Sequence, residues 1–112
     1  MQNIAEIFSE NFWFKLSTFE QLAYIGRSVS IAIDWRKKDD QFQMHDEIEK
    51  TFKLLELTIV DPKNVKRLRE IIVVKELLVD DFCGDNEYRS TNEAWYKYFA
   101  FFEHLIKIEK GK

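Results

Sequence analysis

The sequence has little proline, glycine or cysteine, and each scarcity excludes a class of structure. One proline and three glycines in 112 residues are too few for a turn-rich β-sandwich, so they favour long uninterrupted helices. Cys83 is the only cysteine and cannot form a disulfide within the chain, which fits a reducing compartment. Residues 1–10 lack the basic and apolar regions of a signal peptide. We therefore expect a cytoplasmic protein.

Long hydrophobic runs and a strong net charge are also absent. The longest apolar stretches are far shorter than the about 18 residues of a membrane-spanning helix, so we expect no membrane partner. Seventeen basic and twenty acidic residues leave a formal charge of −3, which gives no general attraction to nucleic acid. With 46% hydrophobic and 33% charged residues, the composition is that of one globular domain over residues 1–112.

Hydrophobic spacing predicts five helices. The β-branched run 71–74 could form a strand locally, but strong helix formers flank it, so we assign it to a helix. Short connections favour antiparallel neighbours. The predicted fold is all-α, an up-down four-helix bundle with an additional short N-terminal helix. The predicted helices cover residues 3–14, 18–37, 40–59, 62–82 and 95–108.

Start signals support these boundaries. Residues 17–20 and 90–93 both match a capping box, in which a Ser or Thr side chain and a Glu three residues later satisfy each other's backbone amides. Asp61 can cap a helix, and Pro62 suits the first helical position, where no amide proton is needed. The Asp61-Pro62 pair is therefore the clearest boundary in the chain.

No motif for catalysis, cofactor or metal binding is present. Three glycines cannot supply a phosphate-binding loop, and neither His45 nor His104 follows a Glu at the spacing of a di-metal helix site. We expect His45 at the edge of the core and His104 in solvent. Asp80 and Asp81 precede Cys83 closely and would raise its pKa, which disfavours a nucleophilic thiolate. We expect no enzyme activity and no cofactor.

The last predicted helix has more apolar surface than one neighbour can cover. Its apolar side chains span roughly 240° of a helical wheel, whereas packing on one neighbour needs an arc only somewhat wider than about 100°. The helix 18–37 carries a second apolar stripe, which can receive the N-terminal helix or a partner. Trp and Tyr are enriched at interface hot spots, so we predict a partner surface, with a self-contained monomer as the alternative. The predicted partner interface is Tyr24, Ile31, Trp35, Tyr96, Phe101 and Ile108.

The predicted function is that of a non-enzymatic helical interaction protein, a homodimer or a binder of another protein. One alternative is a small acidic inhibitor or immunity-type protein that binds an enzyme. Another is a nucleic-acid-associated helical protein, although its basic residues scatter around the helix and nucleic acid is not an expected partner. A third is an enzyme or small-ligand carrier with a tyrosine-lined pocket. The possible acidic patch is Asp80, Asp81, Asp85 and Glu87, and the possible basic patch is Arg36, Lys37, Lys38, Lys63, Lys66 and Arg67.

Overall fold

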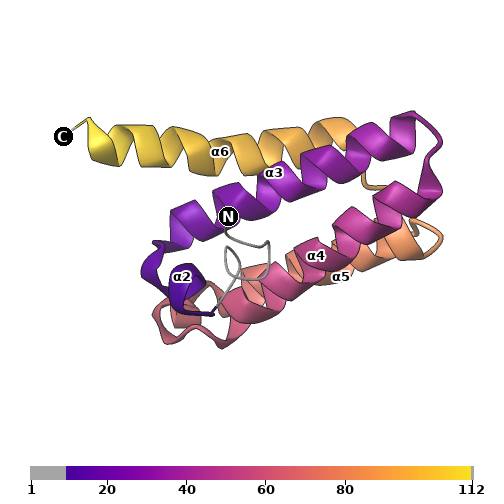
Figure 1. The fold of residues 1–112 in the computed structure, drawn as a ribbon. Coiled ribbons are helices and arrows are strands. Elements are labelled where there is room, and N and C mark those ends of the chain that lie inside the picture. The colour runs from indigo at the N-terminus through magenta and orange to yellow at the C-terminus, as the bar shows by residue number, and fades with distance from the viewer. Residues whose placement is uncertain (1–9, 112) are drawn as a thin grey trace, which may run out of the picture.

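The computed structural model describes residues 10–111, and within them the chain is helical without strands (Figure 1). The predicted first helix is represented by its end alone, and its apolar positions Ile4, Ile7 and Phe8 lie outside the described residues. The elements are α2 (Glu10–Lys15), α3 (Thr18–Lys37), α4 (Gln41–Val60), the 3₁₀ helix η1 (Pro62–Arg67), α5 (Leu68–Cys83) and α6 (Asn92–Lys110).

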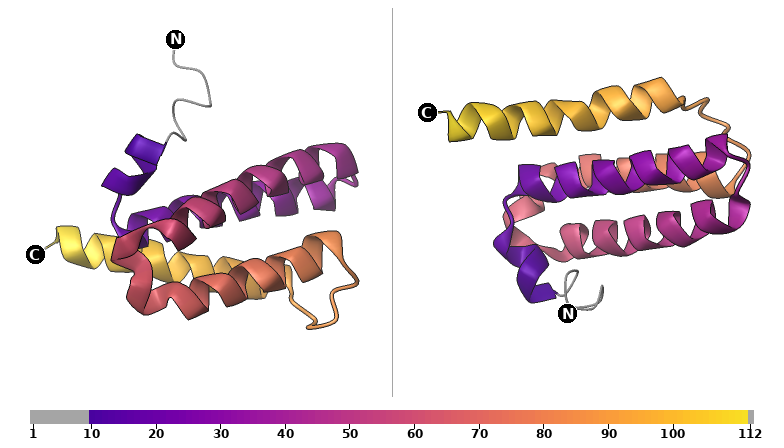
Figure 2. Two further views of the ribbon diagram at one scale, coloured as in Figure 1. Left: turned by 90° about the horizontal axis from the view of Figure 1, so that it is seen from below. Right: turned by 45° about the horizontal axis from the view of Figure 1, so that its top comes forward.

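The four long helices run alternately in opposite directions, as Figures 1 and 2 show. α3 packs along both α4 and α6, α4 packs along α5, and the short α2 packs against α4. α5 and α6 approach each other closely at few places. The C-terminal turns of α6 extend past the beginning of α3 (Figure 2). The predicted up-down bundle with a short N-terminal helix is therefore confirmed.

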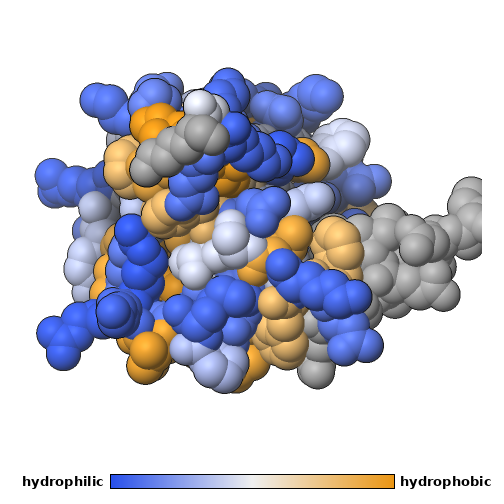
Figure 3. Space-filling view, turned by 90° about the vertical axis from the view of Figure 1, so that its left-hand side faces the viewer, coloured by the Kyte–Doolittle hydropathy of each residue, from blue (hydrophilic) through white to orange (hydrophobic). Residues whose placement is uncertain are grey.

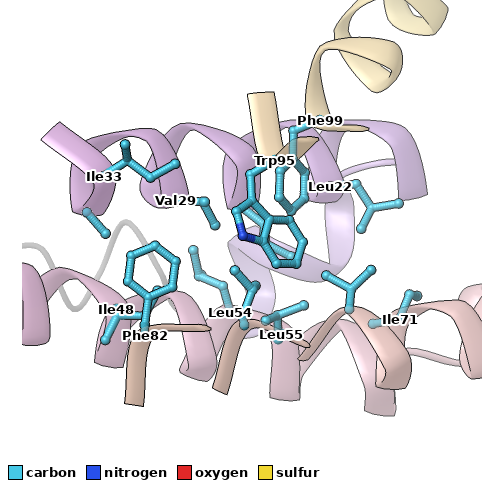
Figure 4. Packing of buried hydrophobic residues seen from close by; sticks show 14 of the residues in the cluster. Leu22, Val29, Ile33, Ile48, Leu54, Leu55, Ile71, Phe82, Trp95 and Phe99 are labelled. Atoms are coloured by element: carbon cyan, nitrogen blue, oxygen red, sulfur yellow. The ribbon is translucent and has the colours of Figure 1, made fainter. Parts of the chain in front are cut away.

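The core lies between α3 and the other three long helices. Figure 4 shows Trp95 and Phe99 of α6 pointing into the space between α3 and the layer formed by α4 and α5. Their rings stack with centroids 6.1 Å apart, and both side chains are almost fully buried. Burial of each large apolar side chain contributes roughly 1.5–3 kcal/mol, so this cluster is a main source of stability. Its other labelled members are Leu22, Val29, Ile33, Ile48, Leu54, Leu55, Ile71 and Phe82.

A buried network of side-chain hydrogen bonds, the polar junction, links α2 to the turn between α4 and η1. The Trp13 indole donates to the Thr58 hydroxyl (2.9 Å), and the Gln21 amide donates both to the Trp13 carbonyl (3.0 Å) and to Asp61 (2.9 Å). Asn64 donates to the Gln21 side-chain oxygen (2.8 Å) and to the Thr58 carbonyl (2.9 Å). Every buried side-chain polar atom in the described residues has a partner, so the junction carries no desolvation penalty from unpaired groups.

This junction explains one difference from prediction. The helix expected over 62–82 begins as 3₁₀ turns over Pro62–Arg67 and becomes α-helical at Leu68. The buried Asn64 side chain is tied to Gln21 and Thr58, and the Asp61 carboxylate accepts the Lys63 amide, so the first turns follow these bonds. The Asp61-Pro62 boundary and the helical assignment of residues 71–74 are confirmed.

The second predicted capping box, over residues 90–93, does not form, and the helix cap lies one residue later. Ser17 and Glu20 form the first box as expected, but α6 is capped by Thr91, which accepts the Ala94 amide at 3.1 Å. Ser90 is held in the preceding loop because its backbone exchanges two hydrogen bonds with the Asn86 side chain. Thr91 is therefore the residue whose side chain is free to cap.

Some predicted core positions are exposed. Helical spacing over residues 62–82 predicts one apolar core face that includes Val65 (69% exposed), Ile72 and Val79, yet all three reach solvent. The 3₁₀ start changes the direction of Val65, while Ile72 and Val79 flank a shallow hollow beside Ile59 of α4. His45 was expected at the core edge and is exposed, and His104 is exposed as predicted.

Candidate functional site

The structure distributes the predicted partner interface over several surfaces. Ile31 and Tyr96 meet in a groove between α3 and α6. Tyr24 is half-buried and packs edge-on against Trp13, with ring centroids 6.0 Å apart. Trp35 is half-buried beneath the Lys38 ammonium, 5.0 Å from its ring centroid. These four residues therefore do not form one continuous patch with Phe101 and Ile108.

Phe101 and Ile108 belong to a second apolar row on α6. The first row packs into the bundle and consists of Trp95, Phe99, Phe102 and Ile106. The second row follows alternating spacings of four and three residues, the spacing of a coiled-coil seam. It is more exposed: Phe101 is 53% and Ile108 is 47% accessible. The second row consists of Ala94, Tyr98, Phe101, Leu105 and Ile108.

The beginning of the second row forms one wall of a groove between α5 and α6. The groove has a volume of about 400 Å³ and an almost entirely apolar lining. Tyr98 and Ala94 contribute from α6, and Val73 and Leu77 contribute from α5. Ser90 lies at one end and Glu70 at the other. The groove and the exposed Phe101 are thus consecutive parts of one face of the molecule.

Polar bridges at both ends hold α5 and α6 together across this groove. At one end the Tyr98 hydroxyl donates to Glu70 (2.5 Å), which also accepts from Arg67 (2.9 Å). At the other end the Trp95 indole donates to the Asp81 carboxylate (2.8 Å). The pKa of the Tyr98 hydroxyl is raised well above its ordinary value. Burial is the largest cause, followed by the hydrogen bond to Glu70 and the negative charge of Glu70. Tyr98 therefore stays a neutral donor at physiological pH.

The possible basic patch is largely engaged within the protein. Arg36 binds Asp81 (2.9 Å) and Asn92 (2.6 Å) and lies 4.1 Å from the centroid of the Phe82 ring. Lys63 binds Asp61 and the carbonyl of Phe14, and Arg67 binds Glu70. Lys37 and Lys38 lie over the rings of Tyr96 and Trp35. Lys66 is exposed on η1.

The possible acidic patch is divided in a similar way. The Asp81 side chain is 4% exposed and is bound to Arg36. The Asp80 carboxylate accepts the backbone amides of Glu87 (2.9 Å) and Tyr88 (3.1 Å) and so shapes the loop that follows α5. Asp85 and Glu87 keep exposed carboxylates. Arg36 and Asp81 were predicted in opposite patches, and the structure joins them as one ion pair.

Two further features of the described residues concern metal binding and the reactivity of Cys83. Among residues 10–111 there is no cluster of three or more His, Cys, Asp or Glu side chains placed to hold a metal. Burial, followed by the charge of Glu49, raises the pKa of the Cys83 thiol, so the thiol stays protonated. A raised pKa is also what the sequence predicted, but from the charges of Asp80 and Asp81, whereas the charge that acts is that of Glu49 on α4. None of the described helices has the length and apolar character to cross a membrane.

Exposed apolar side chains do not merge into one broad patch at the end of the bundle where α6 finishes. Figure 3 looks onto this end and shows apolar side chains reaching the surface in separate places between hydrophilic ones. This end of the bundle therefore offers no broad apolar contact surface.

Comparisons with known proteins give no family for this chain. No protein-family model matches the sequence, and neither the curated proteins nor the solved structures include a significant match.

Sequence reasoning identified Phe101 and Ile108 but missed the groove beside them. The alternating spacing of residues 94, 98, 101, 105 and 108 is the signal that separates the second row from the first. Helical spacing places Val73 and Leu77 off the main apolar face of residues 62–82 and predicts a second buried side there, whereas both line the open groove.

Proposed function

We propose that this protein is a non-enzymatic helical interaction protein whose docking surface is the second apolar row of α6 together with the α5–α6 groove. The supporting observation is a row with coiled-coil spacing that no other described element covers along Phe101 and Ile108. A seam of this spacing is normally buried by a facing helix, because each of its side chains then enters a gap between four partner residues.

Burial also supplies a driving force. Phe101 and Ile108 are each about half exposed, so removing them from water would contribute about 1 kcal/mol each, in addition to the groove lining. The Phe101 ring is an aromatic anchor of the kind found in interface hot spots, although Trp, Tyr and Arg are more strongly enriched there. Protein binding thus makes use of side chains that otherwise remain in contact with water.

Capture experiments test this function. Tagged protein is used as bait in an extract of the native host, with and without nuclease, and bound proteins are identified by mass spectrometry. We expect Phe101→Glu to lose the specific partner and Ile31→Glu, a comparably exposed apolar position in the α3–α6 groove, to retain it. Equal capture by both variants would contradict the proposed surface.

The same experiment addresses the predicted alternatives. Partners that disappear with nuclease treatment would support nucleic-acid association, which needs salt-sensitive phosphate contacts. Loss of the partner on neutralising Asp85 and Glu87, but not on changing Phe101, would support the inhibitor function. Both alternatives have less geometric support, because Arg36 and Asp81 neutralise each other.

A further inference from the structure

We infer that the partner of this docking surface is a second copy of the chain, docked antiparallel along α6 about a two-fold axis that passes between Tyr98 and Phe101. The inference rests on the proposed function, since it names the occupant of the same surface. Two features carry it: a projecting ring beside a groove on one face, and opposite charges at the two ends of that face.

The first feature is shape. A two-fold contact uses the same patch on both copies, so the patch must be complementary to itself. Phe101 projects from α6 one turn beyond Tyr98, which lines the groove. When a second copy lies antiparallel, each Phe101 faces the groove of the other, and both grooves are filled by one symmetric contact.

The spacing of the row gives the register. Antiparallel pairing with the axis between Tyr98 and Phe101 places Tyr98 against Phe101 of the partner subunit, and Ala94 against Leu105 of the partner subunit. Both are pairings of an a position with a d position, which is the arrangement that interlocks side chains between antiparallel helices. The small Ala94 leaves room for the longer Leu105.

The second feature is charge. Near the Ser90 end of the groove, the loop after α5 and the first turn of α6 expose Asp85, Glu87 and Glu93, beside Arg89. In this loop and turn, three exposed carboxylates outnumber one exposed guanidinium. This is also the end at which α6 begins (Figure 1).

The opposite end is predominantly basic. η1 and the first turn of α5 expose Lys66 and Arg69, and η1 lines a hollow together with Glu109 from the end of α6. An antiparallel second copy brings the acidic end of each chain to the basic end of the other, twice. A parallel copy would bring like charges together, so charge selects the antiparallel arrangement.

The first test is the mass of the full chain in solution, measured by light scattering after size exclusion over a range of concentrations. We expect the parent to have twice the chain mass, Phe101→Glu to have the mass of one chain, and Ile31→Glu to remain dimeric. Circular dichroism shows whether each variant has kept its helices. A folded Phe101→Glu that is still dimeric would overturn the proposed interface.

The second test is the register. In a Cys83→Ser background, the double variant Ala94→Cys with Leu105→Cys should form a covalent dimer on mild oxidation. These two positions lie about 16 Å apart along one helix, too far for a disulfide within the chain. Ala94→Cys alone should remain monomeric on a denaturing gel, and its efficient cross-linking would overturn the antiparallel register.

The two proposals fail in different ways. A parent that stays monomeric at every concentration, but captures another protein through Phe101, would overturn the second-copy inference and leave the proposed function standing. A monomer whose captured partners do not depend on Phe101 would overturn both.

Discussion

Arg36 accounts for the main difference between the predicted basic and acidic patches and the observed arrangement of their charges. Its guanidinium binds the buried Asp81 carboxylate, which also accepts the Trp95 indole, so three helices meet at one carboxylate. Asp81 has a side chain only 4% exposed, and loss of its cation leaves a buried charge with a single hydrogen bond. The pair is therefore structural, and neither member is free to bind a charged partner.

We predict that Arg36→Met lowers the free energy of unfolding by about 2 kcal/mol, less than a fully buried pair because Arg36 is partly in water. Urea denaturation at neutral pH measures the change. The matched control is Arg27→Met, which removes an exposed pair with Glu103 and should cost below about 1 kcal/mol. Equal costs for the two substitutions would contradict the structural role of Arg36.

The raised pKa of Tyr98 predicts how the stability of the protein changes at alkaline pH. The pKa of the Tyr98 hydroxyl is raised in the folded state. At pH values above 10.0, the ordinary pKa of tyrosine, the unfolded chain therefore releases this proton while the folded chain keeps it. The free energy of unfolding should therefore fall as the pH rises above about 10. Tyr98→Phe should flatten this fall, while costing about 1 kcal/mol at neutral pH for the lost hydrogen bond to Glu70.

The alkaline comparison needs a second tyrosine as its control. Tyr88 is 73% exposed in the loop before α6, so Tyr88→Phe is the matched substitution at an exposed tyrosine. Denaturant unfolding at a series of pH values gives both slopes. A slope that is the same for parent and Tyr98→Phe would count against the raised pKa.

At the scale of elements, Gly26 sets the distance between α3 and α6. A Cβ atom at this position would lie 2.7 Å from the Cγ of Phe99, closer than such atoms approach each other. We predict that Gly26→Ala lowers the free energy of unfolding by about 1–2 kcal/mol, even though alanine favours a helix. Ser30→Ala, one turn further along α3, should change it by less than about 0.5 kcal/mol. Thermal unfolding of both variants checks the order.

Two substitutions at the start of α6 test which residue caps the helix. Thr91→Ala should cost about 1 kcal/mol, because the Ala94 amide loses its acceptor. Ser90→Ala should cost less than about 0.5 kcal/mol, since the backbone of Ser90, and not its hydroxyl, bonds Asn86. The reverse order in thermal or denaturant unfolding would restore the cap predicted from the sequence pattern.

At the scale of the whole molecule, the charge distribution predicts a salt-dependent dimer. If acidic and basic ends meet, dissociation should increase as the ionic strength rises from about 0.05 to 0.5 M, because salt screens exposed charges. Lys66→Glu should weaken the dimer severalfold, and Lys66→Glu combined with Glu87→Lys should recover part of the loss. Lys53→Glu, an exposed position on α4, serves as the control and should have no effect. Sedimentation velocity measures each dissociation constant.

The candidate surface was predictable only in part. Periodicity placed Phe101 and Ile108 among surplus apolar positions because a helical wheel gives the direction of each side chain from its own axis. It could not separate them from Tyr24, Ile31 and Trp35, because the wheel does not say which neighbour covers which direction. That depends on how far apart the helices settle, and here α5 and α6 settle with a groove between them.

The sequence by itself determined the helices, most of their ends and the up-down order. These follow from local signals: apolar spacing, the cap at Ser17, the break at Asp61-Pro62 and the short connections that favour antiparallel neighbours. The tertiary structure decided which charges neutralise each other and which apolar row stays in contact with water. Arg36 and Asp81 are 45 residues apart in the chain, and only packing brings such groups within hydrogen-bond distance.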